Sequence, residues 1–160
     1  MVRTKRGGAA AMAGHNLALQ VTAWEAVLEV GATLSDSTFE LEVDGSSLRV
    51  IEGTGGMQAL GEDDKANIHQ TIDDEVLKRG DIVFRSTSVE SAGDGLSVAG
   101  ELTLAGKTKP LTFVLGVRED GTLAGTATIT QSAWGMKPYS ALWGALKVLD
   151  DVEVALDGKL

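Results

Sequence analysis

Apolar and polar residues alternate along much of the chain. From 96 to 104 the even positions are apolar or glycine and the odd positions are mostly polar, and the segments 111–117 and 123–129 repeat the alternation after glycine-containing turns. Successive side chains of a strand point to opposite faces, so each segment is predicted to be a half-buried strand. The three strands together predict an antiparallel meander joined by hairpins.

Three further segments carry the same alternation. Residues 39–43 alternate apolar and acidic side chains, and 82–89 begin another strand. Near the C-terminus the even positions of 148–156 are apolar except for Asp150. These patterns predict additional half-buried strands, the last with one acidic residue on its inner face.

The segment 17–30 changes its pattern midway. Leu17, Leu19 and Val21 fall on one face, whereas Trp24 and the alternating residues after it fall on the other. A change of face within one strand is what a bulge or sharp bend produces, and barrel closure requires such bends. We therefore predict a bend near residues 22–23.

One segment has helical periodicity. Between 62 and 78, Ile68, Ile72 and Val76 recur at i, i+4 and i+8, and three acidic residues occupy the first turn, where they complement the helix dipole. Gly80 is predicted to end this helix.

The inventory predicts a mainly β fold. About eight antiparallel strands and one main helix (62–78) are typical of a closed, lipocalin-like barrel, with the helix packed over one opening through its apolar face. A two-sheet sandwich is the alternative. A length of 160 residues without a linker-like shift in composition favours one domain, 1–160.

Composition removes several classes of function. Fourteen basic and 23 acidic residues give a net charge of −9, which disfavours nucleic acid and anionic membranes as partners. The absence of cysteine excludes disulfides, thiolate nucleophiles and cysteine-based metal sites. No apolar stretch is long enough to span a membrane, and residues 7–14 lack the apolar core of a signal peptide, so we expect a cytoplasmic protein without stable membrane insertion.

A phosphate-binding loop is suggested by Gly106, Lys107 and Thr108 but fails on its context. The first glycine of that motif would stand at position 101, which is Glu, and Pro110 interrupts the helix that should follow. A hairpin turn is predicted instead.

Several short motifs carry a resemblance. They are GELTLAGKTKPLTF at 100–113, IVFRS at 82–86, WGMKP at 134–138, GHNL at 14–17 and LRVIEG at 48–53. In this order and spacing they resemble the YceI-like family, in its actinobacterial form. The resemblance implies a lipocalin-like barrel that binds polyisoprenoid or similar lipids.

The candidate ligand contacts combine aromatic residues with small residues on inner faces. Gly100, Gly125 and Ala127 leave space where larger side chains would close a lumen, although each aromatic residue is also a candidate for plain core packing. The predicted lumen and mouth residues are His15, Trp24, Phe39, Phe84, Gly100, Leu102, Phe113, Ala127, Ile129, Trp134, Met136, Tyr139 and Trp143.

The segment 132–146, SAWGMKPYSALWGAL, carries only one charge in a long connection. A purely solvated loop would be polar, so we expect this one to fold back over apolar surface and bury much of its aromatic area, as a lid or as a fixed plug.

Little in the sequence supports catalysis. The chain has two histidines, no metal-ligand spacing and no distinctive nucleophile, so we predict no catalytic residue, no metal and no cofactor. The first hypothesis is a barrel that carries or sequesters an elongated apolar molecule or lipid. The alternatives are an enzyme acting on an apolar substrate through His15, Tyr139 or Asp150, and an interaction or stress protein without a ligand. Pairing with a second copy stays open.

Overall fold

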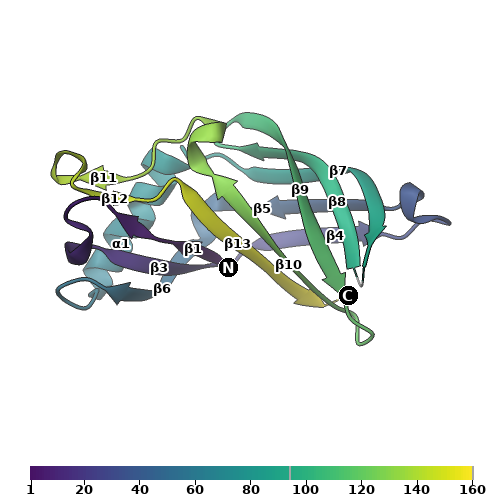
Figure 1. Cartoon of the computed structure of the whole chain (residues 1–160), viewed down its shortest axis with the longest axis horizontal. Helices are drawn as coiled ribbons and strands as arrows, with labels where there is room; N and C mark the ends of the chain where they lie inside the picture. Colours follow the sequence, from purple (N-terminus) through teal and green to yellow (C-terminus); the bar gives the residue numbers. More distant parts are fainter. Residues whose placement is uncertain (94, 160) are drawn as a thin grey trace.

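The computed structural model describes residues 1–93 and 95–159, and strands dominate it (Figure 1). Ten strands form one curled antiparallel sheet in the order β4-β5-β7-β8-β9-β10-β13-β1-β3-β6. Their bounds are β1 Val2–Thr4, β3 His15–Val21, β4 Trp24–Glu29, β5 Thr38–Val43, β6 Leu48–Gly55, β7 Ile82–Ala92, β8 Gly95–Leu104, β9 Lys107–Val117, β10 Thr122–Thr130 and β13 Asp151–Lys159.

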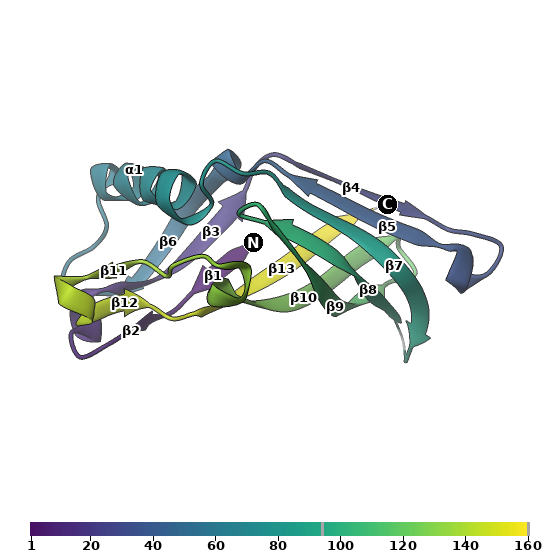
Figure 2. The same ribbon diagram turned by 90° about the horizontal axis from the view of Figure 1, so that it is seen from above.

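A second, smaller sheet has the order β11-β12-β2. Its strands are β11 Ser140–Ala141, β12 Leu146–Val148 and β2 Arg6–Gly7. Figures 1 and 2 both place this sheet at the same end of the molecule as helix α1 (Glu62–Thr71). The chain therefore adds two extra elements, a helix and a small sheet, at one end of the curled sheet only.

The predicted bend is present and explains the strand count. β3 ends at Val21 and β4 begins at Trp24. Opposite this break, their partner strands are also interrupted, because β5 ends at Val43 and β6 begins at Leu48. Across the bend, Thr22 N donates to Ser47 O at 3.3 Å and Asp44 N donates to Ala23 O at 3.1 Å. The pairs β3–β4 and β5–β6 are thus two long strands kinked at one place, and counting each pair once turns ten strands into the predicted eight.

The helix begins where its acidic first turn predicts. Gly61 N donates to the Asp64 carboxylate at 2.9 Å, and α1 continues into a π-helical turn, η4, at Ile72–Val76. The predicted termination at Gly80 is not how the helix ends: Lys78 and Arg79 adopt left-handed φ values of 55° and 54°. The wide π-turn is the reason, because Arg79 N reaches back to Asp73 O at 2.8 Å and closes the helix before Gly80.

The β8–β9–β10 meander replaces any phosphate loop. Ala105 and Gly106, with φ of 49° and 75°, form a two-residue turn, and β9 starts at Lys107. Pro110 lies in the part of β9 that pairs with β8 but not with β10. Its missing N–H therefore removes no hydrogen bond to a second strand.

The packing of side chains inside the curled sheet differs between its two halves. In the first, which we call the packed half, Phe39, Val89, Val98, Leu115 and Leu123 are buried. The second, the hollow half, lies beside α1 and the small sheet. The rings of Phe39, Phe84 and Phe113 lie at the border, with centroids 5.3–6.1 Å apart.

Within the described residues, no helix combines the length and the apolar character that crossing a membrane would require.

Candidate functional site

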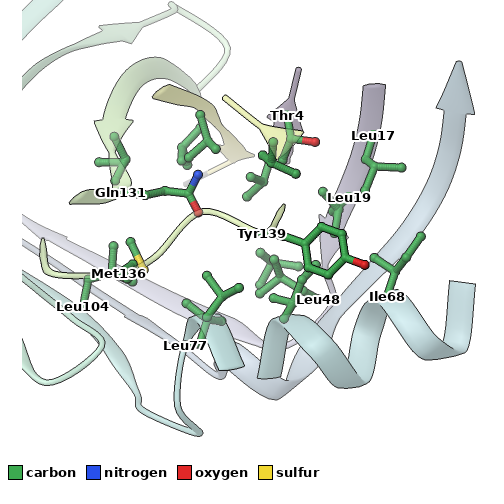
Figure 3. A pocket seen from close by; sticks show the side chains of 18 of the residues that line it. Thr4, Leu17, Leu19, Leu48, Ile68, Leu77, Leu104, Gln131, Met136 and Tyr139 are labelled. Atoms are coloured by element: carbon green, nitrogen blue, oxygen red, sulfur yellow. The ribbon is translucent and has the colours of Figure 1, made fainter. Parts of the chain in front are cut away.

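The hollow half contains a cavity of about 640 Å³. This volume lies in the range of roughly 300–1,000 Å³ that is usual for small-molecule sites. Its wall is built mainly from aliphatic side chains of the curled sheet, which Figure 3 shows converging on one space. They include Val2, Leu17, Leu19, Leu48, Leu102, Leu104, Leu111, Ile129, Val152, Val154 and Leu156.

Helix α1 and its π-turn supply another side of the cavity. Ile68, Ile72, Val76 and Leu77 all line it and pack against the core. The apolar face that the sequence predicts for this helix therefore faces the cavity.

The mouth of the cavity lies between α1 and the small sheet. Asp64 and Asn67 of α1, Tyr139 before β11 and Lys147 of β12 line the cavity and are also exposed to solvent. These residues come from the two elements that face each other at this end of the molecule (Figure 2), which places the opening between them. The wall thus changes from aliphatic in the interior to polar and charged at the rim.

Two rim residues are fixed by hydrogen bonds to backbone. Arg6 donates from Nη1 to Gly14 O at 2.6 Å, and the Nε2 atom of His15 lies 2.7 Å from Gln58 O. Both residues line the cavity. The His15 nitrogen must donate here, because a carbonyl oxygen only accepts, so this ring atom is engaged by the rim itself.

The far end of the cavity is closed by aromatic rings. Phe84 and Phe113 line the cavity, whereas Phe39 lies behind them in the packed half and is completely buried. A cavity occupant that entered at the mouth would therefore end against Phe84 and Phe113.

Most of the residues predicted for the lumen and mouth line this one cavity. They come from β3, β7, β8, β9, β10 and the segment after β10: His15, Phe84, Leu102, Phe113, Ala127, Ile129, Met136 and Tyr139. The structure therefore brings these side chains together, although they are spread from residue 15 to residue 139.

Three other predicted residues lie away from the cavity wall, on or in the sheet. Trp24 is 42% exposed at the start of β4. Phe39 belongs to the packed half. Gly100 leaves no free space, because a Cβ there would lie 2.6 Å from Phe84 Cζ and 2.7 Å from Ser86 Cα. Its small size admits the neighbouring strand and ring rather than a ligand.

The two tryptophans of the 132–146 segment behave differently from each other. Trp134, at the end of the 3-10 turn η5 (Gln131–Trp134), is buried, and its Nε1 donates to Leu102 O at 3.0 Å. Trp143 is fully exposed and has a left-handed φ of 53°. The segment buries Trp134 but not Trp143, because the β11–β12 connection is a tight turn that projects from the small sheet.

Asp150 does not occupy the inner face that the sequence pattern suggests. It lies in the corner before β13, where its carboxylate accepts hydrogen bonds from the hydroxyl and, at 2.8 Å, from the backbone N–H of Ser132. These bonds, led by that from the hydroxyl, lower the pKa of Asp150 below its ordinary value. The strand pattern breaks here because β12 and β13 belong to different sheets.

Gln131 is a cavity residue that the sequence analysis did not single out. It is buried, lines the cavity, and continues the inner-face positions 123, 125, 127 and 129 of β10. The sequence feature that indicates this residue is its polar side chain on an otherwise apolar inner face.

The shifted carboxyl groups lie away from the cavity. Among residues 1–93 and 95–159, the carboxyl groups with a lowered pKa are Asp74, Asp120 and Asp150, and none of these three lines the cavity. Within residues 1–93 and 95–159, no cluster of three or more His, Asp or Glu side chains is arranged to hold a metal ion.

Comparison with protein families gives one match, to the YceI-like domain, over residues 5–160. A search of curated proteins gave no match.

Solved structures with the same fold include BcnA from Burkholderia cenocepacia, with a TM-score of 0.69 and 16% identity over 98% of this chain and 94% of that chain. The Campylobacter jejuni YceI protein aligns with a TM-score of 0.55 and 14% identity over 91% of this chain and 86% of its own. At these identities the likeness concerns the fold.

Proposed function

Because the chain belongs to the YceI-like family, we propose that it binds an elongated apolar molecule, a polyisoprenoid or similar isoprenoid lipid, and acts as a carrier or sequestering protein. The observation that carries the proposal is the cavity of about 640 Å³ with its aliphatic wall, polar rim and aromatic floor. The fold and the family support binding of an apolar ligand, and the isoprenoid class is the proposed refinement.

The chemistry of the wall supports affinity without catalysis. Transfer of a CH₂ group from water into an apolar site is worth about 0.8 kcal/mol, so a chain of several isoprene units gains affinity from burial alone. An amphipathic molecule fits the gradient of the wall, with its apolar chain against residues such as Leu19 and Ile72. The proposal includes no reaction, and the enzyme alternative rests on His15 and Tyr139 at the rim.

Native mass spectrometry of the freshly purified protein tests the proposal directly. We expect a fraction of the protein to carry an additional apolar molecule, which organic extraction removes and which can then be identified. Protein of the bare sequence mass that also fails to take up added isoprenoid would contradict the proposal.

A pair of tryptophan substitutions, one inside the cavity and one outside it, tests the position of the ligand. Ala127 lines the cavity from β10, whereas the next residue, Thr128, is exposed on the outer face of the same strand. Ala127→Trp should reduce the affinity for an apolar fluorophore at least about tenfold, because the indole takes the ligand's volume, and Thr128→Trp should leave it unchanged. Equal affinities in the two variants would place the ligand elsewhere.

A further inference from the structure

Gln131 places a polar amide in the apolar wall of the cavity, which aliphatic packing does not explain. The residue is only 6% exposed, and its amide points into the space enclosed by Met136, Leu77 and Tyr139 (Figure 3). A buried amide needs partners for both its nitrogen and its oxygen.

The nitrogen of this amide is already engaged. Nε2 donates to Leu149 O at 3.0 Å and to Asp150 O at 3.4 Å. Both partners are carbonyl oxygens, which only accept, so the orientation of the amide is fixed with nitrogen toward the β12–β13 corner. The oxygen Oε1 must then face the other way.

The backbone of Gln131 holds the side chain in place. Its N–H donates to Asp150 O at 2.9 Å, and its carbonyl accepts from Met136 N at 3.1 Å. With the backbone N–H, the backbone carbonyl and Nε2 all bonded, Gln131 cannot turn its oxygen away from the cavity without breaking several bonds.

The oxygen itself lacks a partner within the described residues. No hydrogen bond to Gln131 Oε1 occurs there, and the one side-chain polar atom that is both buried and unpaired in the described part of the chain is Thr4 Oγ1. Gln131 Oε1 is therefore accessible, and the space it borders is the cavity.

We infer that Gln131 Oε1 is a fixed hydrogen-bond acceptor for the ligand and selects isoprenoid-like molecules that carry a neutral donor, such as an alcohol, over analogues that carry only acceptors. This inference rests on the proposed function. A neutral donor fits because the charged side chains that line the cavity, Arg6, Asp64 and Lys147, belong to β2, α1 and β12 around the mouth, and a charge buried without a partner is costly.

The selectivity follows from the cost of an unpaired acceptor. A hydroxyl group satisfies Oε1, whereas a methyl ether removes the water that would otherwise bind there and offers no proton. We expect geranylgeraniol to bind about tenfold more tightly than its methyl ether, since sites built for a hydroxyl reject analogues that lack it.

The test is a double comparison of ligand and variant. Geranylgeraniol and its methyl ether are titrated, by displacement of an apolar fluorophore, into the wild type, Gln131→Met and the control Thr128→Val, which changes an exposed residue on the outer face of β10. The preference for the alcohol should vanish in Gln131→Met and persist in Thr128→Val. The ratio of two affinities on one protein does not depend on its folded fraction, so lost stability in Gln131→Met leaves the result interpretable.

The outcomes separate this inference from the proposed function. If the wild type binds both compounds tightly and with nearly equal affinity, the role of Gln131 is overturned and the proposed function stands. The same holds if the preference for the alcohol survives in Gln131→Met. Failure of both compounds to bind the wild type overturns both.

Discussion

The packed half and the hollow half share strands β7, β8, β9 and β10 but differ in the side chains that these strands turn inward. Phe39, Val89, Val98 and Leu115 fill the first completely, with no measurable exposure, while the second leaves a cavity of about 640 Å³ between Leu19, Ile72 and their neighbours. Both halves satisfy the same alternation of apolar and polar residues. The comparison teaches that alternation builds the wall of such a barrel and that side-chain volume and added elements decide whether it is filled.

The largest expected effect is the loss of a ring of the packed half. Phe39→Ala should lower the free energy of unfolding by about 3–5 kcal/mol, because the ring is fully buried against Phe84 and Phe113. Ile68→Ala in the hollow half should lower it by less than about 2 kcal/mol, because one side of Ile68 already faces the cavity. Urea unfolding of the two variants measures the difference, and equal losses would mean that the two halves are equally packed.

A smaller effect is expected where a glycine lets two parts of the packed structure approach. Gly100→Ala should destabilise the protein by about 1–3 kcal/mol, because its methyl group would collide with Arg85 O and Phe84 Cζ. The control is Gly116→Ala on β9, where, among the described residues, an added Cβ would approach Ala124 O at 3.3 Å and nothing closer. Thermal unfolding should rank Gly100→Ala clearly below Gly116→Ala, and the reverse order would contradict the packing role of Gly100.

Trp134 connects the turn after β10 to the cavity-lining strand β8. Trp134→Phe keeps most of the buried ring but removes the donor to Leu102 O, so the free energy of unfolding should fall by about 1–2 kcal/mol. Trp143→Phe, at a fully exposed position, should change it by less than about 0.5 kcal/mol. Equal effects in chemical denaturation would show that the Trp134 hydrogen bond contributes nothing.

The smallest expected effect is on the pH dependence of stability, and it concerns two carboxylates that lie in turns. The pKa of Asp150 is lowered by hydrogen bonds from Ser132, and the pKa of Asp120, in the β9–β10 turn, by hydrogen bonds from Thr122. When the pKa of a carboxyl group is lower in the folded than in the unfolded state, the group stabilises the fold at pH values above its ordinary pKa of 3.8. This contribution is lost as the pH falls through the pKa of the folded state.

Ser132→Ala should therefore raise the pKa of Asp150 toward 3.8 and leave that of Asp120 unchanged, as followed by NMR titration of the carboxyl carbons. The stability difference between this variant and the wild type should be present at neutral pH and shrink below about pH 4. A difference that grows in acid would contradict the assignment of the lowered pKa to Ser132.

The sequence by itself determined the elements and much of the wall. Alternation predicted the meander β8–β9–β10 and the bend at residues 22–23, and the i, i+4, i+8 spacing predicted that Ile68, Ile72 and Val76 share one face. These features depend on local geometry, in which each residue's direction follows from its position in a strand or helix. The family motifs then indicated the barrel.

Only the tertiary structure decided how space is divided inside it. Gly100 and Ala127 both look like gaps in a sequence, yet Phe84 from the neighbouring strand occupies the first, and the second remains open to the cavity. Likewise, Gln131 reads as one polar residue after β10, and only the carbonyls of the distant β12–β13 corner fix its oxygen toward the cavity. Both outcomes depend on partners remote in the chain, whose side chains and backbone groups meet only when the sheet curls.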